Sequence, residues 1–197
     1  MARVAFIVAD MFEDSEFREP YERLRKAGHE VTVIGSDPTR PIHGKQGKEK
    51  IVPDASIDSV SADRFDALVI PGGYSPDKLR MDPRMVEFTR DFHAQGKTIA
   101  AVCHAPWMLI EADIVRDKTV TSWPSIRTDL TNAGAHWVDQ EVVEDGTIIT
   151  SRKPADLPAF SAAILHRLDS PPSRAERPER SMDRSSERSS LSDRPAI

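Results

Sequence analysis

Short strand-like runs alternate with longer amphipathic segments over the first 168 residues of the chain. The strand-like runs lie at 4–9, 29–34, 66–70 and 98–102. Several of the segments between them repeat apolar side chains every three or four residues, as a helix does when one face is buried. Strands that alternate with helices indicate a parallel sheet with crossover helices, so we predict an α/β fold.

Glycine and proline mark where the predicted elements begin and end. Gly28 is expected to end the first helix, and Pro106 suits the first turn of a later one. Helices are predicted over 15–27, 82–95, 106–112, 125–133 and 156–168. Weaker strand signals lie at 119–122 and in a hairpin across Asp145-Gly146, and the Gly- and Pro-containing segment 35–53 is expected to carry another short hairpin.

The composition changes abruptly after Leu168. Residues 169–197 contain eight Ser, six Arg and four Pro, with almost no apolar side chain to bury. Such a segment cannot bury enough surface to offset the entropy lost on ordering. We therefore predict one domain over residues 1–168, which is long enough for an ordinary core, and a disordered tail over 169–197.

The charge balance and the length of the apolar runs exclude several classes of function. Asp and Glu number 32 against 27 Lys and Arg, and the net charge of −5 provides no overall attraction to nucleic acid or anionic lipid. No apolar run approaches the roughly 20 residues that span a bilayer, and the first residues lack the apolar stretch of a signal peptide. We expect a cytoplasmic protein without a nucleic-acid or membrane partner.

Sequence motifs for cofactors are absent. No G-x-G-x-x-G follows the first strand and no G-x-x-x-x-G-K-[ST] occurs, so a nucleotide phosphate lacks its usual backbone cradle. The six His residues include no i, i+4 pair, and one cysteine allows neither an intrachain disulfide nor a zinc cluster. No cofactor or metal is predicted, and Cys103 is expected to matter only as a thiol.

Three predicted strands end in residues that can do chemistry. In open parallel sheets, ligands bind outside the carboxyl ends of the strands, where loops and helix N-termini converge. These strand ends carry, in chain order, Glu13 and Glu16, Gly72 and Gly73, and Cys103 and His104. Together they supply acids, backbone amides and a nucleophile.

Each of these residues also has a purely structural interpretation. Cys103 is either a small buried side chain or a nucleophile on a sharp strand-to-helix turn, where the helix N-terminus lowers a thiol pKa from about 8.5. His104 acts as a base or caps the turn. The two acids complement the helix dipole or approach the thiol, and the two glycines make a tight turn or present N–H groups to a substrate oxygen. The residues alone leave these alternatives open.

Four separated blocks of the sequence resemble the ThiJ/PfpI superfamily, and its PfpI-like intracellular peptidase branch in particular. The blocks are VAFIVADMFEDSE at 4–16, LVIPGG at 68–73, AAVCHAP at 100–106 and TSWPSI at 121–126. The resemblance runs in order over residues 3–168 and leaves out only the tail. It implies a flavodoxin-like α/β sandwich with a mainly parallel sheet and helices on both faces.

The resemblance also implies roles for individual residues. Cys103 matches the reactive cysteine of a nucleophile elbow, Glu16 the acid that hydrogen-bonds it, and Glu13 a second acid lining the pocket. His104 matches the histidine that follows the cysteine. Main-chain donors for an oxyanion would include Gly73 and His104.

Two positions depart from the family pattern. Asp77 falls where PfpI-like hexamers carry an acid, often Glu, that completes a Cys-His-acid triad in a neighbouring subunit, so the shorter side chain limits its reach. Trp123 stands where a pocket tyrosine is common, and indole cannot accept a hydrogen bond. Gly72 and Trp123 are assigned with Gly73 to the substrate-binding part of the site.

The leading functional prediction is a stress-response cysteine hydrolase of the deglycase or glyoxalase type, acting on methylglyoxal or glycated adducts through Cys103. One alternative is an intracellular cysteine peptidase whose triad is shared between subunits. Another is a redox sensor or chaperone without turnover, in which Cys103 oxidises and Glu16 holds the product. The expected partners are small carbonyl compounds, glycated or peptide substrates, and further copies of the chain in a homodimer or hexamer.

Overall fold

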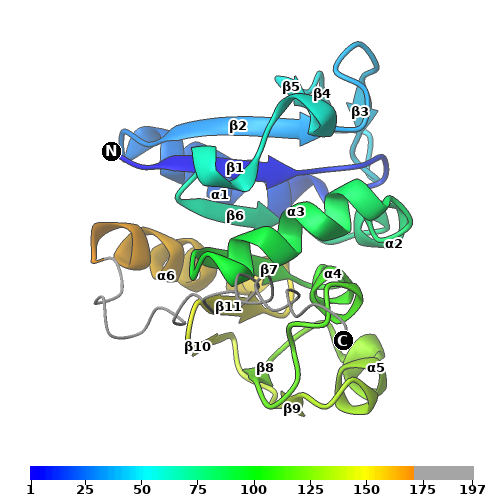
Figure 1. Cartoon of the computed structure of the whole chain (residues 1–197), viewed down its shortest axis with the longest axis vertical. Coiled ribbons are helices and arrows are strands. Elements are labelled where there is room, and N and C mark those ends of the chain that lie inside the picture. Colours follow the sequence, from blue (N-terminus) through cyan, green and yellow to red (C-terminus); the bar gives the residue numbers. More distant parts are fainter. Residues whose placement is uncertain (171–197) are drawn as a thin grey trace, which may run out of the picture.

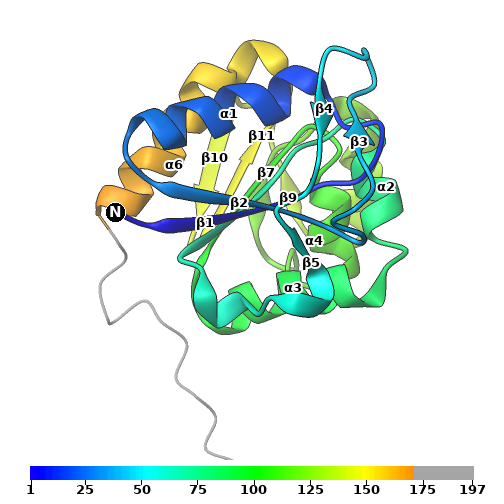
Figure 2. The same cartoon turned by 90° about the horizontal axis from the view of Figure 1, so that it is seen from above.

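A seven-stranded sheet runs through the domain, with helices packed on both of its faces (Figure 1; Figure 2). The computed structural model describes residues 1–170, so nearly all of the predicted tail lies outside the described residues. The strand order is β10-β11-β7-β6-β1-β2-β5, and every neighbouring pair is parallel except β10 with β11. This arrangement confirms the predicted flavodoxin-like α/β architecture.

This sheet and two small two-stranded sheets contain the predicted strands, together with short strands at Ala55–Ser56 and His136–Trp137 that were not predicted. The strands are β1 (Arg3–Ile7), β2 (Glu30–Gly35), β3 (Ile42–His43), β4 (Lys50–Ile51), β5 (Ala55–Ser56), β6 (Ala67–Ile70), β7 (Thr98–Val102), β8 (Thr119–Val120), β9 (His136–Trp137), β10 (Val142–Asp145) and β11 (Ile148–Ser151). The hairpin expected within 35–53 is the β3–β4 pair, and the one across Asp145-Gly146 is the β10–β11 pair. The weak strand near 119–122 instead pairs with β9, outside the main sheet.

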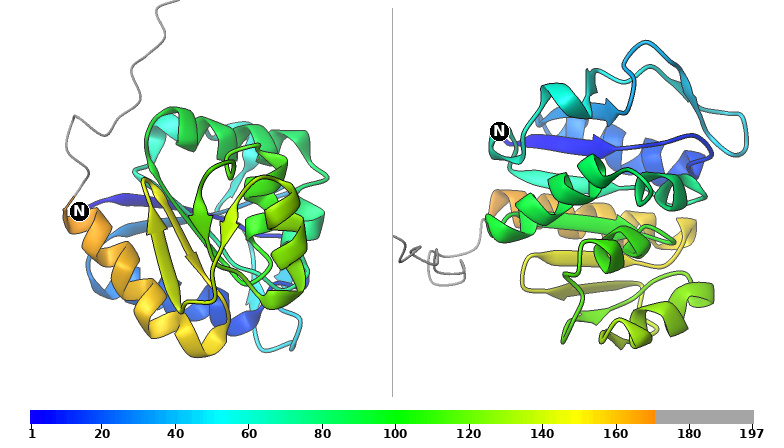
Figure 3. Two further views of the ribbon diagram at one scale, coloured as in Figure 1. Left: turned by 90° about the horizontal axis from the view of Figure 1, so that it is seen from below. Right: turned by 45° about the vertical axis from the view of Figure 1, so that its right-hand side comes forward.

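The helices are α1 (Asp14–Lys26), α2 (Ser75–Leu79), α3 (Pro83–Ala94), α4 (Pro106–Glu111), α5 (Arg127–Asn132) and α6 (Leu157–Asp169). Helices α1 and α6 cover one face of the sheet and α3 covers the other, as seen from above in Figure 2. The α5 segment, with β8 and β9, gathers beyond the β10 end of the sheet (Figure 3). The short α2 was not predicted, because a single helical turn has too few residues to show a period.

Local chemistry fixes one end of α1 and one end of α3. Helix α1 ends as expected where Gly28 adopts φ +87°, a conformation that costs glycine little. Asp82 caps α3 by accepting a hydrogen bond from the N–H of Arg84 at 3.0 Å.

Neighbouring residues of each strand bury opposite sides of the sheet. Phe6 packs with Phe17 of α1, while Ile7 joins the cluster that contains Phe92 of α3. Because both layers are apolar, the central strands are buried on both faces, as parallel strands require. Within residues 1–170, no helix has the length and apolar character needed to cross a membrane.

Candidate active site

The site lies where β1, β6 and β7 end side by side. These three strands are adjacent in the sheet, and their arrows point to the edge where α2 and α4 lie (Figure 1). The loops that follow them therefore bring the predicted acids, the Gly72-Gly73 pair and Cys103 together, as the parallel topology requires.

Cys103 occupies a strained turn between β7 and α4. Its φ of +64° is unusual for a residue with a Cβ, and only 7% of the residue is exposed. Two backbone hydrogen bonds, each 3.0 Å long, hold the turn. The N–H of Cys103 donates to the carbonyl of Ser151, and the carbonyl of Cys103 accepts from the N–H of Trp123. This is the geometry of a nucleophile elbow.

The two glycines allow the loop after β6 to approach the thiol. A methyl group on Gly72 would lie 2.6 Å from Oε2 of Glu16 and 2.7 Å from Cβ of Cys103. Gly73 has φ +74°, and a methyl group there would lie 2.5 Å from the backbone nitrogen of Glu13. Any larger residue would push the acids and the cysteine apart.

Glu16 is completely buried next to the cysteine. Its Oε2 accepts the N–H of Gly72 at 2.9 Å, whereas Oε1 has no partner of hydrogen-bonding geometry among the described residues. Burial, and then the charge of Glu13, raise the pKa of Glu16 to about 8. The carboxyl group therefore keeps its proton at neutral pH. Because the N–H of Gly72 donates to Glu16, it is not free to donate a hydrogen bond to an oxyanion.

The surroundings of Cys103 raise the pKa of its thiol, so the expected lowering by the helix N-terminus is wrong for this site. Burial is the largest cause, and the charge of Glu16 adds to it. The backbone N–H groups of Gly73 and His104 favour the anionic sulfur and so act to lower the pKa. Because two buried negative charges repel each other, a thiolate forms most readily while Glu16 remains protonated.

Glu13 is held by two residues that the sequence analysis missed. Nζ of Lys45 lies 2.6 Å from its Oε2, and Nε2 of Gln46 donates to its Oε1 at 2.8 Å. Both come from the loop of the β3–β4 hairpin. The motif GKQG at 44–47 marks a turn, but nothing in its pattern links it to an acid more than thirty residues earlier.

The β3–β4 loop is itself fixed by Asp14 at the start of α1. The Asp14 carboxylate accepts the N–H groups of Gln46, Lys48 and Glu49 at 2.8–2.9 Å. These bonds lower the pKa of Asp14, although burial acts to raise it. Asp14 thus places Lys45 at the edge of the site.

His104 faces the thiol. Its Nδ1 lies 3.2 Å from Sγ of Cys103, its Nε2 lies 3.1 Å from Oγ of Ser125, and its ring centroid lies 5.2 Å from that of Trp107. Burial, and then the charge of Lys45, lower the pKa of His104, so the ring is neutral at neutral pH. The position of Nδ1 supports the interpretation of His104 as a base.

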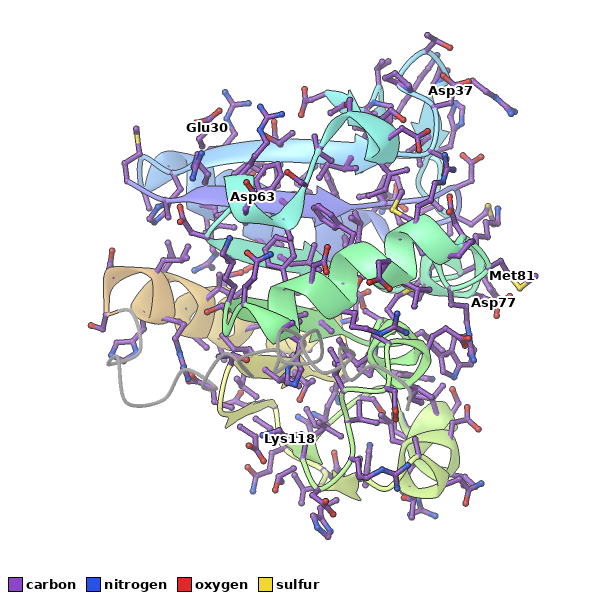
Figure 4. The ribbon with its side chains drawn as sticks, viewed as in Figure 1. Glu30, Asp37, Asp63, Asp77, Met81 and Lys118 are labelled. Atoms are coloured by element: carbon purple, nitrogen blue, oxygen red, sulfur yellow. The ribbon has the colours of Figure 1, made fainter. Side chains whose placement is uncertain are left out.

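Asp77 and Trp123 lie further out. Asp77 is an exposed residue of α2, and Figure 4 shows it with Met81 at the outer edge of the molecule. Within residues 1–170 of one chain, no hydrogen bond joins Asp77 to His104, so the chain alone does not form the expected triad. Trp123 is 40% exposed. The hydrogen bond from its backbone N–H to the carbonyl of Cys103 links it to the site.

The described part of the chain offers no evident metal site. No group of three or more His, Cys, Asp or Glu side chains within residues 1–170 is arranged to hold an ion.

Comparison with known proteins gives one consistent family. The model of the DJ-1/PfpI family matches residues 2–167. Protein/nucleic acid deglycase 2 of Escherichia coli is 48% identical over 84% of this chain and 97% of its own length. Two Bacillus subtilis proteins are also similar: general stress protein 18 (45% identity, 85% of this chain, 98% of its own length) and putative cysteine protease YraA (44%, 84% and 98%).

A solved structure has the same fold. It is a two-domain protein from Anabaena variabilis, containing DJ-1/ThiJ/PfpI-like and ferritin-like domains. It matches 86% of this chain and 48% of its own length, with a TM-score of 0.85 and 44% sequence identity.

Proposed function

Because the chain belongs to the DJ-1/PfpI family, we propose that it is a stress-response cysteine hydrolase of the deglycase or glyoxalase type. One observation carries the proposal: a buried protonated carboxyl group, a neutral imidazole and two backbone amides surround a single thiol. Such a site suits a small carbonyl compound, which needs a nucleophile and a proton donor but little binding surface.

The reaction begins with attack of the Cys103 sulfur on an aldehyde carbon. The thiol proton passes to Nδ1 of His104, a C–S bond forms, and the carbonyl π electrons move to oxygen. N–H groups of Gly73 and His104, which already face the sulfur, stabilise the oxyanion. Glu16 donates its proton to the oxyanion, which gives a neutral hemithioacetal, and the proton held by His104 then returns to Glu16.

Methylglyoxal consumption tests this proposal. The wild-type protein is expected to consume methylglyoxal, and Cys103→Ala is expected to abolish the activity. Thr131→Ala serves as a matched control, because Thr131 is an exposed residue of α5 whose hydroxyl donates a hydrogen bond to the carbonyl of Arg127. An unchanged rate in Cys103→Ala would remove the mechanism.

A cysteine peptidase is the second candidate, supported by the similarity to a putative cysteine protease. Asp77 is exposed and unbonded to His104 of its own chain, so this activity needs a second copy to supply the acid. The peptidase predicts a higher-order homo-oligomer in which Asp77→Ala abolishes cleavage of a fluorogenic peptide. Cleavage that survives Asp77→Ala, or a stable active dimer, excludes the shared triad.

A further inference from the structure

The imidazole of His104 has three contacts that together set its orientation. Nδ1 faces Sγ of Cys103 at 3.2 Å and Nε2 faces Oγ of Ser125 at 3.1 Å. The ring packs at 52° against the indole of Trp107, with 5.2 Å between centroids. Both ring nitrogens are therefore occupied without any residue from another chain.

The indole that supports the ring is itself held in place. Nε1 of Trp107 donates to Oδ2 of Asp129 at 2.9 Å. The Arg80 guanidinium lies 5.8 Å from the indole centroid and also donates to Oε2 of Glu111. These contacts limit the movement of Trp107, so His104 packs against an indole that is held in place.

The tautomer of His104 determines the direction of both of its hydrogen bonds. A neutral imidazole carries one N–H, and the groups that face its nitrogens decide which. The lowered pKa of His104 and the raised pKa of Cys103 favour the neutral pair at neutral pH. In the tautomer that leaves Nδ1 unprotonated, the thiol donates to Nδ1, the ring proton lies on Nε2, and the Ser125 hydroxyl accepts a hydrogen bond from Nε2–H.

We propose that Ser125 is a positioning residue that orients His104 from within the same chain. Its hydroxyl accepts a hydrogen bond from Nε2–H and so keeps the Nδ1 lone pair directed at Cys103. Within one chain, Ser125 thus supplies a hydrogen-bond partner for the ring that the peptidase alternative assigns to an acid of a neighbouring subunit. This inference rests on the proposed function for the use of His104 as a base, but its geometry does not depend on the substrate.

The first test measures the tautomer directly. A long-range ¹H–¹⁵N spectrum distinguishes the protonated from the unprotonated ring nitrogen, and His104→Gln assigns the signals. The wild-type protein is expected to carry the proton on Nε2, and Ser125→Ala is expected to give a mixture of tautomers. Ser125→Thr keeps the hydroxyl and is expected to retain the wild-type spectrum.

The second test follows Cys103 alkylation by iodoacetamide against pH. At neutral pH, Ser125→Ala is expected to slow alkylation about three- to tenfold, the range for losing one net hydrogen bond. In alkaline solution, where the thiol ionises without a base, the rates should converge. Thr131→Ala controls for removal of an exposed hydroxyl elsewhere in the same region, and it should match the wild type at every pH.

Several results overturn the proposal. They are a proton on Nδ1 in the wild type, an unchanged spectrum and alkylation profile in Ser125→Ala, or a Ser125→Thr protein that behaves like Ser125→Ala. Neither assay uses a substrate. If the wild type fails to consume methylglyoxal, the proposed function fails, while the spectrum and the alkylation profile still decide the role of Ser125.

Discussion

The protonation of Glu16 determines what Cys103 can do. A charged Glu16 opposes the thiolate through its charge and as a hydrogen-bond acceptor, and both effects raise the pKa of the thiol. A protonated Glu16 can instead donate a hydrogen bond to the sulfur. The same carboxyl group therefore favours the Cys103 thiolate when it is protonated and disfavours it when it is ionised.

Substitution Glu16→Gln separates these two effects. Glutamine is neutral at every pH, so the thiolate should form at lower pH than in the wild type, and iodoacetamide should alkylate Cys103 faster in mildly alkaline solution. Methylglyoxal turnover should instead fall by about 10²–10⁴-fold, because an amide cannot supply the catalytic proton.

Glu22→Gln is the control for this experiment, since Glu22 is an exposed residue of the same helix. It should leave both rates unchanged. If Glu16→Gln slows alkylation and turnover together, the charge of Glu16 does not oppose the thiolate. The protonation states argued for Glu16 and Cys103 are then wrong.

Glu16 also makes stability depend on pH. Its pKa is about 8 in the folded protein against 4.5 for the unperturbed group, so the folded state binds more protons between these values. The stabilisation by the protonated group is fully present below pH 4.5 and is lost as pH rises through about 8. Each pKa unit corresponds to about 1.4 kcal/mol, so the free energy of unfolding should fall by a few kcal/mol.

Urea titrations at several pH values measure this effect. In Glu16→Gln the contribution of this residue disappears, so the decline between these pH values should be smaller than in the wild type. Glu22→Gln should retain the wild-type slope. Equal slopes in all three proteins would show that Glu16 is already ionised in the folded state.

At the scale of elements, the β3–β4 hairpin depends on the first residue of α1. The Asp14 carboxylate accepts three backbone N–H groups of the hairpin loop. Asp14→Ala leaves these donors without a partner and is expected to cost about 2–4 kcal/mol of unfolding free energy. Because the loop also carries Lys45, methylglyoxal turnover should fall as well.

Asp14→Asn is the matched variant, because its amide oxygen can still accept, and it should lose less stability than Asp14→Ala. Urea unfolding checks the order. The lowered pKa of Asp14 means that its contribution is present above the unperturbed value of 3.8 and is lost as pH falls through the lower folded value. A difference between Asp14→Ala and wild type that persists at strongly acid pH would contradict this account.

Elements with a clear period or a clear boundary residue were predictable, and the single-turn pieces were not. The apolar pattern of residues 98–102 predicted the observed bounds of β7, Thr98–Val102. The positions of the strand ends were enough to predict that Glu16 and Cys103 lie at the same edge of the sheet. Lys45 and Ser125 were missed because they lie in the β3–β4 loop and in a single 3₁₀ turn (Pro124–Ile126), whose positions are set by tertiary contacts. The direction of the Cys103 pKa was missed because burial outweighs the nearby N–H groups, and burial is a property of the whole fold.

At the scale of the molecule, α6 closes the sheet face that α1 covers only in part (Figure 2). Phe160 and Ile164 of α6 are fully buried in the same cluster as Phe6 of β1. A chain that ends before residue 157 would expose this apolar face of β11 and β7. The domain therefore needs residues up to the end of α6, about where the composition changes.

This arrangement predicts different outcomes for two truncations. Removal of residues 171–197 should leave the melting temperature and methylglyoxal turnover unchanged, because the helices, strands and both core clusters described here lie before residue 171. Removal of residues 157–197 should unfold the protein, because burial of several large side chains, each contributing about 1.5–3 kcal/mol, is lost. Calorimetry and turnover on the two truncated chains check this. A lower melting temperature or lower activity after the shorter truncation would show that residues 171–197 contribute to the domain or its site, and the predicted boundary at 168 would then be wrong.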